Sequence, residues 1–126
     1  MIVILDYGMG NSGSMQNMLR RIGAPSLVTL DCNKLISASA VILPGVGAFD
    51  NGIQKLITSG IFECLQQRVL QDKVPFLGVC LGMQLLLDGS EEGTLPGLGW
   101  IPGNVKRFDF SGSDKAGLKI PHMGWN

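Results

Sequence analysis

One cysteine of this 126-residue chain lies in a pattern that favours nucleophilic chemistry. Cys80 is the centre of Gly78-Val-Cys-Leu-Gly82, with a glycine two residues away on each side. The pattern is typical of a sharp strand-to-helix turn that exposes its central side chain, because glycine avoids clashes there. At a helix N-terminus, unsatisfied N–H groups favour the thiolate, which is the nucleophilic form. The sequence therefore predicts a nucleophile, and a buried structural cysteine is the alternative.

A glycine-rich loop follows a short apolar run in the first half of the chain. Pro44-Gly-Val-Gly-Ala-Phe-Asp50 comes directly after this run, at the kind of strand end where α/β sheets collect ligands. Flexible glycine peptides can turn their N–H groups toward the oxyanion that forms when a thiolate attacks an amide carbonyl. The alternative is that this loop is only a turn between two elements.

A second glycine-rich loop supports an interpretation from another functional class. Gly8, Gly10 and Gly13 have the G-x-G-x-x-G spacing after the first apolar run of the chain. Asp31 follows the second apolar run, about 20 residues further on, where a dinucleotide-binding domain has an acidic residue for the ribose. A dinucleotide-binding Rossmann domain is therefore an alternative, although it leaves Cys80 without a role.

The elements that must position these loops alternate between strands and helices. Apolar runs predict buried strands at residues 2–5, 26–30, 40–43 and 75–79, and apolar stripes or good helix formers predict helices around 15–22, 62–69 and 80–87. This alternation predicts an α/β fold with an open, mostly parallel sheet and a central first strand. Glycine and proline interrupt the chain beyond residue 91, so strands near residues 105–108 are expected to be antiparallel or peripheral.

Composition narrows the possible partners. Ten lysines and arginines balance ten aspartates and glutamates, so no net charge draws the chain to nucleic acid or to an anionic membrane. Apolar residues make up 45% of the chain and charged residues 16%, which indicates that some apolar surface faces a partner. No internal repeat or linker divides residues 1–126, so they are expected to form one domain.

No apolar run approaches the roughly 20 residues needed to span a bilayer, and the first residues lack the basic part of a signal peptide. These two features predict a cytoplasmic protein. Cys32, Cys64 and Cys80 lack the paired spacing of a zinc site or a disulfide framework, so we expect reduced thiols.

Five blocks of residues resemble a single family. They are Asp6-Tyr-Gly-Met-Gly-Asn11, Pro44-Gly-Val-Gly47, Gly78-Val-Cys-Leu-Gly-Met-Gln84, Ser90-Glu-Glu-Gly93 and Pro121-His-Met-Gly-Trp-Asn126. Their order resembles that in the glutaminase subunits of imidazole glycerol phosphate synthases, which belong to the class I glutamine amidotransferases. The resemblance implies a three-layer, flavodoxin-like α/β fold in which residues 1–126 are the N-terminal part of the amidotransferase domain.

The resemblance also implies an activity. Subunits of this family hydrolyse glutamine to glutamate and ammonia through a cysteine thioester, and they require no metal or cofactor. The ammonia passes to a (β/α)₈ barrel cyclase, the partner in a heterodimer that makes imidazole glycerol phosphate during histidine biosynthesis. A paralogous group supplies ammonia to enzymes that amidate sugars of surface polysaccharides, and the sequence does not separate these two acceptors.

Roles for individual residues follow from the positions that match the family. The nucleophile is Cys80. The backbone positions that stabilise the oxyanion are Val46, Gly47 and Leu81. The positions that hold glutamine are Gly47, Gln84 and Glu92, of which Glu92 suits the α-ammonium group. The positions that face the barrel are Pro121, His122, Met123, Trp125 and Asn126.

The catalytic His and Glu of the family lie beyond the last matching block. His122 is the only histidine in the chain, and its block faces the partner, so we expect an interface residue rather than the base for Cys80. We therefore expect a C-terminally truncated chain that is inactive, or nearly so, by itself. The alternative is a docking module that occupies the barrel partner without delivering ammonia.

Overall fold

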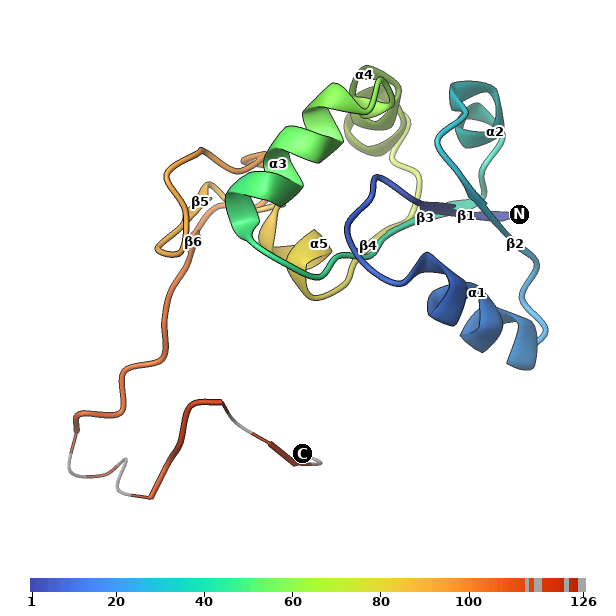
Figure 1. Cartoon of the computed structure of the whole chain (residues 1–126). Coiled ribbons are helices and arrows are strands. Elements are labelled where there is room, and N and C mark those ends of the chain that lie inside the picture. The colour runs from blue at the N-terminus through green and yellow to red at the C-terminus, as the bar shows by residue number, and fades with distance from the viewer. Residues whose placement is uncertain (113, 115–116, 122, 125–126) are drawn as a thin grey trace.

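Four short apolar segments pair as a sheet, and helices occupy most of the connections between them (Figure 1). The structure is a computed structural model that describes residues 1–112, 114, 117–121 and 123–124. In chain order the elements are β1 (Ile2–Leu5), α1 (Ser12–Arg21), β2 (Ser26–Thr29), α2 (Cys32–Ile36), β3 (Ala40–Leu43), α3 (Phe49–Thr58), α4 (Phe62–Gln66), the π-helix η1 (Gln67–Gln71), β4 (Phe76–Gly78), α5 (Leu81–Gln84), β5 (Gly89–Ser90) and β6 (Asn104–Val105).

The main sheet has the strand order β2-β1-β3-β4, which confirms the prediction that the first strand is central. Val3 of β1 lies opposite Leu27 of β2 on one side and Val41 of β3 on the other. Leu43 of β3 pairs with Gly78 of β4. Each of these pairings is parallel, so the carboxyl ends of the strands meet at one edge of the sheet.

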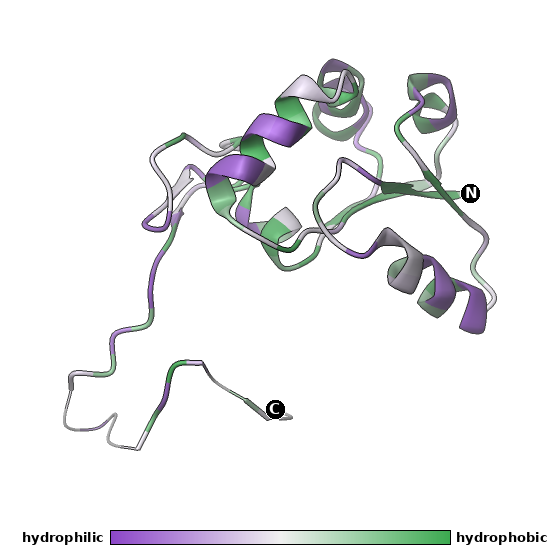
Figure 2. Cartoon of the chain, viewed as in Figure 1, coloured by the Kyte–Doolittle hydropathy of each residue, from purple (hydrophilic) through white to green (hydrophobic). Residues whose placement is uncertain are grey.

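Alternate residues of the central strands pack against opposite helical layers. Ile4 and Ile42 pack with Leu19 of α1 on one face of the sheet. Val3 and Leu43 belong to a larger core on the other face, where α2, α3 and α4 lie (Figure 1). Figure 2 shows apolar strands between these layers and polar residues on the outer turns of α1 and α3. This layered arrangement confirms the predicted α/β fold class.

Two helices occupy segments for which the sequence patterns predict no helix. α2 begins after Asp31, whose carboxylate accepts a hydrogen bond from the Asn33 N–H at 2.9 Å. α3 begins at Phe49, within the second part of the predicted loop. Phe49, Ile53 and Leu56 are buried at the i, i+4, i+7 spacing of one helical face, which explains why this segment is helical.

Two other segments differ from their prediction. The helix expected over residues 80–87 is only the four residues of α5. The helix ends because the carbonyl groups of the next two residues accept hydrogen bonds from outside it. The Leu98 N–H donates to the Leu85 carbonyl at 2.8 Å, and the Trp100 N–H donates to the Leu86 carbonyl at 2.9 Å. The strand expected near residues 105–108 is β6, which is peripheral as predicted but pairs with β5 in parallel.

Cys32 and Cys64 form a disulfide, so the prediction that they are reduced thiols is wrong. Cys32 opens α2, Cys64 lies in α4, and their Cα atoms are 6.0 Å apart. Their spacing is uninformative because the partners are 32 residues apart and meet only when both helices pack on one face of the sheet. In the chain-entropy model, a cross-link over such a loop stabilises the fold by roughly 4 kcal/mol.

Asp50 connects the start of α3 to the loop that follows β5. Its carboxylate accepts hydrogen bonds from the Thr94 N–H at 2.9 and 3.1 Å, from the Thr94 Oγ1 hydroxyl at 3.1 Å and from the Leu95 N–H at 3.0 Å. These bonds, first among them the one from the Thr94 backbone, hold the pKa of the Asp50 carboxyl below its usual value. A Cβ at Gly93 would collide with this carboxylate. The loop that carries Glu92 is therefore fixed to α3.

Beyond β6 the chain runs away from the sheet and its helices (Figure 1). Phe108 stacks on Phe110 with ring centroids 5.5 Å apart, and Phe108 remains 65% exposed. Leu118, Ile120 and Met123 are also exposed. In the part of the chain that the structure describes, no helix has the length and apolar character that crossing a membrane requires.

Thiol titration tests the disulfide. In protein purified without reductant, we expect a chromogenic thiol reagent to find one reactive thiol, because Cys80 is free and exposed. After reduction and denaturation the same reagent should find three thiols, one for each cysteine of the sequence. A double variant, Cys32→Ser with Cys64→Ser, should give one thiol under both conditions. A second reactive thiol in the native wild-type chain would contradict the pairing.

Replacing Asp50 tests its connection to the loop after β5. Asp50→Asn keeps the size of the side chain but replaces an acceptor oxygen by an NH₂ group that faces N–H donors. We expect faster amide hydrogen exchange at Thr94 and Leu95 and a lower free energy of unfolding. Glu63→Gln, on the exposed side of α4, is the matched control and should change neither.

The difference in unfolding free energy between wild type and Asp50→Asn is also expected to depend on pH. The folded-state pKa of Asp50 lies below the unfolded value of about 3.9, so its contribution to stability is present above that value and is lost as the pH falls through the folded pKa. The difference in unfolding free energy between wild type and Asp50→Asn should therefore be constant near neutral pH and shrink below about pH 4. Chemical denaturation at several pH values measures it, and a difference that grows in acid would contradict the assignment.

Candidate active site

Cys80 lies at a sharp turn between β4 and α5, where its flanking glycines predict such a turn. Its backbone has φ 55° and ψ −117°, a conformation that residues other than glycine rarely adopt. Strain of this kind costs of the order of 1–3 kcal/mol and persists only where the surroundings hold it. The Cys80 side chain is free and exposed, so an electrophile in solution can reach the sulfur.

The glycines on either side of Cys80 are required by close backbone contacts. A Cβ at Gly78 would lie 2.7 Å from the Cα of Met83, and a Cβ at Gly82 would collide with the carbonyl oxygen of Leu43. The turn can therefore form only without side chains at both positions. The helix that follows Cys80 has only four residues and is shorter than the helix expected from the sequence.

The glycine-rich loop after β3 lies beside this turn because β3 and β4 are neighbours. The Val79 N–H donates to the Leu43 carbonyl at 3.0 Å, so the parallel pairing continues to the residue before Cys80. Val46 is 66% exposed, and Gly47 is exposed with φ 124°. The structure thus brings the predicted nucleophile next to the loop that contains two of the predicted oxyanion positions.

The third predicted oxyanion donor, the backbone N–H of Leu81, is already occupied. It donates a hydrogen bond to the carbonyl oxygen of Gly45 at 3.2 Å. In nucleophile turns of this kind, the N–H of the residue after the nucleophile is one of the oxyanion donors. The hydrogen bond between the Leu81 N–H and the Gly45 carbonyl must therefore break before this N–H can bind an oxyanion.

Tyr7 is a buried neighbour of this site to which the sequence patterns assign no role. It follows β1 and is 4% exposed. Burial raises the pKa of its hydroxyl above the usual value, and a negative charge on Cys80 raises it further. The Tyr7 hydroxyl therefore stays protonated at neutral pH and lies within electrostatic reach of Cys80.

The predicted glutamine-binding residues come from three segments. Gly47 lies in the loop after β3, where a Cβ would come within 2.8 Å of the Met9 side chain. Gln84 is the last residue of α5 and is half-buried. Glu92 is exposed in the loop after β5, and its N–H donates to the Ser90 hydroxyl at 3.1 Å. The hydrogen bonds of Asp50 position this third segment.

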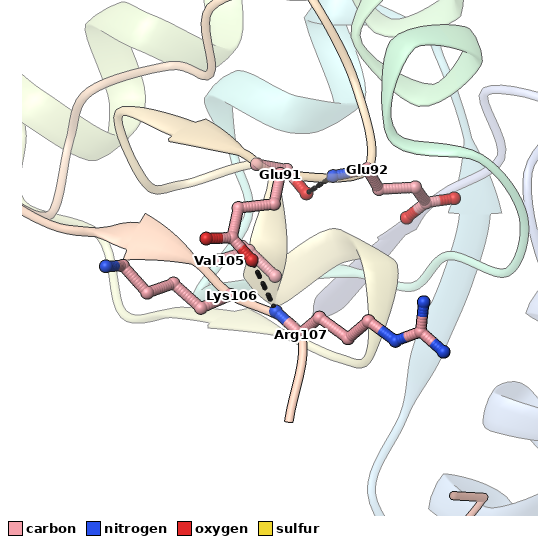
Figure 3. A pocket seen from close by; sticks show the side chains of 6 residues that line it. Glu91, Glu92, Val105, Lys106 and Arg107 are labelled. Carbon is pink, nitrogen blue, oxygen red and sulfur yellow. Dashed lines mark hydrogen bonds between the residues drawn. The ribbon is translucent and has the colours of Figure 1, made fainter. Parts of the chain in front are cut away.

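Glu92 lines a hollow of about 580 Å³ between the loop after β5 and the segment after β6 (Figure 3). The Arg107 N–H donates to the Glu91 carboxylate at 2.9 Å and so joins the two sides. Figure 3 shows the Arg107 guanidinium and the Glu92 carboxylate extending to the same side. The lining residues are Ser90, Glu91, Glu92, Val105, Lys106 and Arg107. The hollow therefore carries both signs of charge, and no motif in the sequence indicates the contribution of Arg107.

Two of the predicted partner-facing residues can be placed. Pro121 is exposed, and Met123 is 84% exposed. Together with Leu118 they help to line a hollow of about 380 Å³ in the segment beyond β6. The predicted residues that lie outside the described part of the chain are His122, Trp125 and Asn126.

The first glycine-rich loop does not support the dinucleotide-binding alternative. Lys55 of α3 donates to the Gly8 carbonyl at 3.0 Å, and Gly10 packs against the backbone of Gly45, so neighbouring parts of the protein fill the loop. The carboxylate of Asp31 caps α2. Within the described residues, no cluster of three or more His, Cys, Asp or Glu side chains could hold a metal ion.

Comparison with known proteins identifies close relatives. The imidazole glycerol phosphate synthase subunit HisH 2 of Methanococcus maripaludis is 51% identical over the whole of this chain, and subunit HisH of Bdellovibrio bacteriovorus is 48% identical over 127 aligned residues. Subunit HisH of Leptospira interrogans is 46% identical. The chain spans 60% of the length of the first relative and 61% of the other two.

A solved structure and a family model give further comparisons, one for the fold and one for the family. The crystal structure of a glutamine amidotransferase superposes with a TM-score of 0.69, at 22% sequence identity, over 89% of this chain and 59% of that one. This likeness confirms the predicted fold. The sequence model described as glutamine amidotransferase class-I matches residues 3–126. By this match over nearly its whole length, the chain belongs to the class I glutamine amidotransferase family.

Proposed function

We propose that this chain supplies the nucleophile of a glutaminase that hydrolyses glutamine to glutamate and ammonia. The observation that carries the proposal is the free, exposed Cys80 at φ 55°, on a strand-to-helix turn beside the glycine-rich loop after β3. Relatives named as subunits of imidazole glycerol phosphate synthase are 46–51% identical, which supports the same chemistry here.

The proposed reaction has two covalent steps. The Cys80 sulfur attacks the side-chain amide carbon of glutamine, a carbon–sulfur bond forms, and the carbonyl electron pair moves onto oxygen. Collapse of this intermediate breaks the carbon–nitrogen bond, and the nitrogen leaves as ammonia with the proton that the thiol has given up. Water then attacks the γ-glutamyl thioester, which releases glutamate and restores the thiol. Backbone N–H groups at Val46, Gly47 and Leu81 stabilise the oxyanion in each step.

Recognition of glutamine requires groups for its ammonium and carboxylate ends. We assign the α-ammonium to Glu92, and Gln84 and Gly47 contact the rest of the substrate. The mixed charge of the hollow that Glu92 lines suits a zwitterion, because carboxylate and guanidinium groups extend to the same side. The Asp50 hydrogen bonds keep this loop in place while the substrate binds.

The proton transfers require a base. The only histidine of the chain, His122, lies outside the described residues and falls in the block assigned to the partner face. We assign the base to a His and its supporting Glu from the portion of the relatives that this chain does not span. Such a base is needed because removing one member of a catalytic triad costs several orders of magnitude in rate.

The ammonia acceptor is the second part of the proposal. We assign it to a (β/α)₈ barrel cyclase subunit that makes imidazole glycerol phosphate in histidine biosynthesis, in a cytoplasmic heterodimer. Exposed apolar side chains near Pro121 support a contact there, since Met123 is 84% and Leu118 53% exposed.

An electrophilic analogue of glutamine tests the nucleophile and the substrate. We expect the chloromethyl ketone analogue to modify Cys80 alone, and L-glutamine to protect it. In Glu92→Gln the glutamine concentration needed for half protection should rise roughly tenfold, because a charge-assisted hydrogen bond is lost. Peptide mapping after brief labelling identifies the modified residue, and labelling rates give the protection constant.

Two controls make the result specific. Glu63→Gln should leave protection nearly unchanged, because Glu63 is exposed on α4 and does not line the hollow. Cys80→Ser should abolish labelling. Equal protection by D-glutamine, or labelling that glutamine does not slow, would refute the assignment of glutamine as substrate.

The partner face is tested by a substitution in the segment beyond β6. Met123→Asp places a charge on a side chain that we assign to an apolar contact, and should weaken binding to the barrel subunit by roughly 1–4 kcal/mol. Titration calorimetry measures the affinity. Met18→Asp is the matched control, since Met18 is 57% exposed on α1. Identical affinities for the wild type and Met123→Asp would remove Met123 from the interface.

A further inference from the structure

Tyr7 carries a buried hydroxyl that has no hydrogen-bond partner among the described residues. The side chain is 4% exposed, so water does not satisfy the hydroxyl from outside. Unpaired buried polar groups are costly and uncommon, and each calls for an explanation. The indole N–H of Trp100 is in the same situation and provides a comparison.

The Tyr7 hydroxyl lies directly against Gly45. A Cβ built on Gly45 would come within 2.6 Å of the Tyr7 oxygen, 2.8 Å of the Gly82 nitrogen and 2.9 Å of the Leu81 Cβ. The Tyr7 hydroxyl and the first residues after Cys80 therefore meet on the same side of Gly45. The hydroxyl is protonated at neutral pH, as its raised pKa indicates, and is available as a donor.

Gly45, the residue that the Tyr7 hydroxyl lies against, has a carbonyl group that could accept a hydrogen bond, although the hydroxyl makes none in this structure. At present that carbonyl accepts the Leu81 N–H at 3.2 Å. An oxyanion at Cys80 would compete for the same N–H, and the displaced Gly45 carbonyl would then be buried without a donor. Gly45 and Gly47 have no side chains that would clash when the peptides between them turn, and Gly47 already has a φ of 124°.

We propose that Tyr7 is a positioning residue of the glutaminase site, whose hydroxyl donates to the Gly45 carbonyl when that carbonyl releases the Leu81 N–H to the oxyanion. The inference rests on the proposed function, because only attack on a carbonyl creates the oxyanion. Tyr7 does not touch the substrate. It stabilises the arrangement of the loop in which the oxyanion donor is free.

Labelling of Cys80 with two electrophiles tests whether Tyr7 acts on the oxyanion or on the reactivity of the Cys80 thiol in general. Attack of Cys80 on the chloromethyl ketone analogue of glutamine forms a carbon–sulfur bond at the carbonyl and places the electron pair on oxygen. The sulfur then bonds to the methylene carbon and displaces chloride, while its bond to the carbonyl carbon breaks and the carbonyl re-forms. Iodoacetamide alkylates the Cys80 sulfur directly: the sulfur attacks the methylene carbon, iodide leaves, and no oxyanion develops. In the 126-residue chain, Tyr7→Phe should slow labelling by the ketone roughly tenfold and leave the iodoacetamide rate unchanged.

Stability provides an independent readout. Because Tyr7→Phe removes an unsatisfied buried hydroxyl, its melting temperature should equal or exceed that of the wild type. Trp100→Phe removes the other unpaired buried donor and is the matched control; it should change neither labelling rate. An unchanged ketone rate in Tyr7→Phe, or equal slowing with both reagents, would overturn the role of Tyr7. Absence of Cys80 labelling by the ketone in the wild type would instead refute the glutaminase function itself.

A measurement on the wild type needs no substitution. Tyr7 is the only tyrosine of the chain, so the tyrosine doublet in the ultraviolet resonance Raman spectrum reports its hydroxyl alone. The doublet should change from that of an unpaired hydroxyl to that of a donor when an analogue of glutamine with an aldehyde in place of its amide forms a hemithioacetal with Cys80, because the oxygen of this tetrahedral adduct takes the oxyanion position. A doublet that is identical before and after formation of the hemithioacetal would overturn the proposal.

Discussion

Residues 41–43 of β3 pair in parallel with residues 76–78 of β4, and the hydrogen bond from Val79 to Leu43 extends this pairing to the last residue before Cys80. The two chain segments that leave these strands must therefore start side by side. One carries Cys80, the proposed nucleophile, and the other carries the glycine peptides that we propose face an oxyanion. A one-residue shift of the β3–β4 register would move each side chain to the opposite face of the sheet and separate these groups.

Close approach of backbones is the second constraint at this edge of the sheet. Cβ atoms at Gly10 and Gly45 would lie 3.1 Å and 2.8 Å from the backbones of Gly45 and Gly82 respectively, so three loops meet without side chains between them. The strained φ of Cys80 is held by this packing. A peptide that turns in one loop changes the hydrogen bonds of the next, which is why the Leu81 N–H and the Tyr7 hydroxyl can be linked through one carbonyl group.

The outer parts of the molecule are held by longer-range connections. The disulfide between Cys32 and Cys64 joins α2 to α4 on the face of the sheet that α3 also covers. Asp50, in the first turn of α3, holds the loop of Glu92 through the Thr94 and Leu95 amides. The residues that we propose to bind glutamine thus come from separate segments, and the position of the Glu92 loop depends on a carboxylate whose pKa is lowered by the hydrogen bonds that it accepts.

The sequence by itself determined where the strands lie, because short apolar runs that end at turn residues are typical of strands, and it determined the Cys80 turn, because two glycines at fixed spacing are needed there. The prediction that all four strands are buried is wrong for the edge strands β2 and β4, since none of their residues is fully buried and Leu77 of β4 is 55% exposed. The short α5 and the helix α3 depended on hydrogen bonds and packing that local pattern does not contain. The disulfide, the Asp50 contacts with Thr94, the pairing of Leu81 with Gly45 and the unpaired hydroxyl of Tyr7 were decided only by tertiary structure. Each depends on residues that are far apart in the chain, and these residues meet because parallel strands bring distant loops to one edge of the sheet or distant helices to one face.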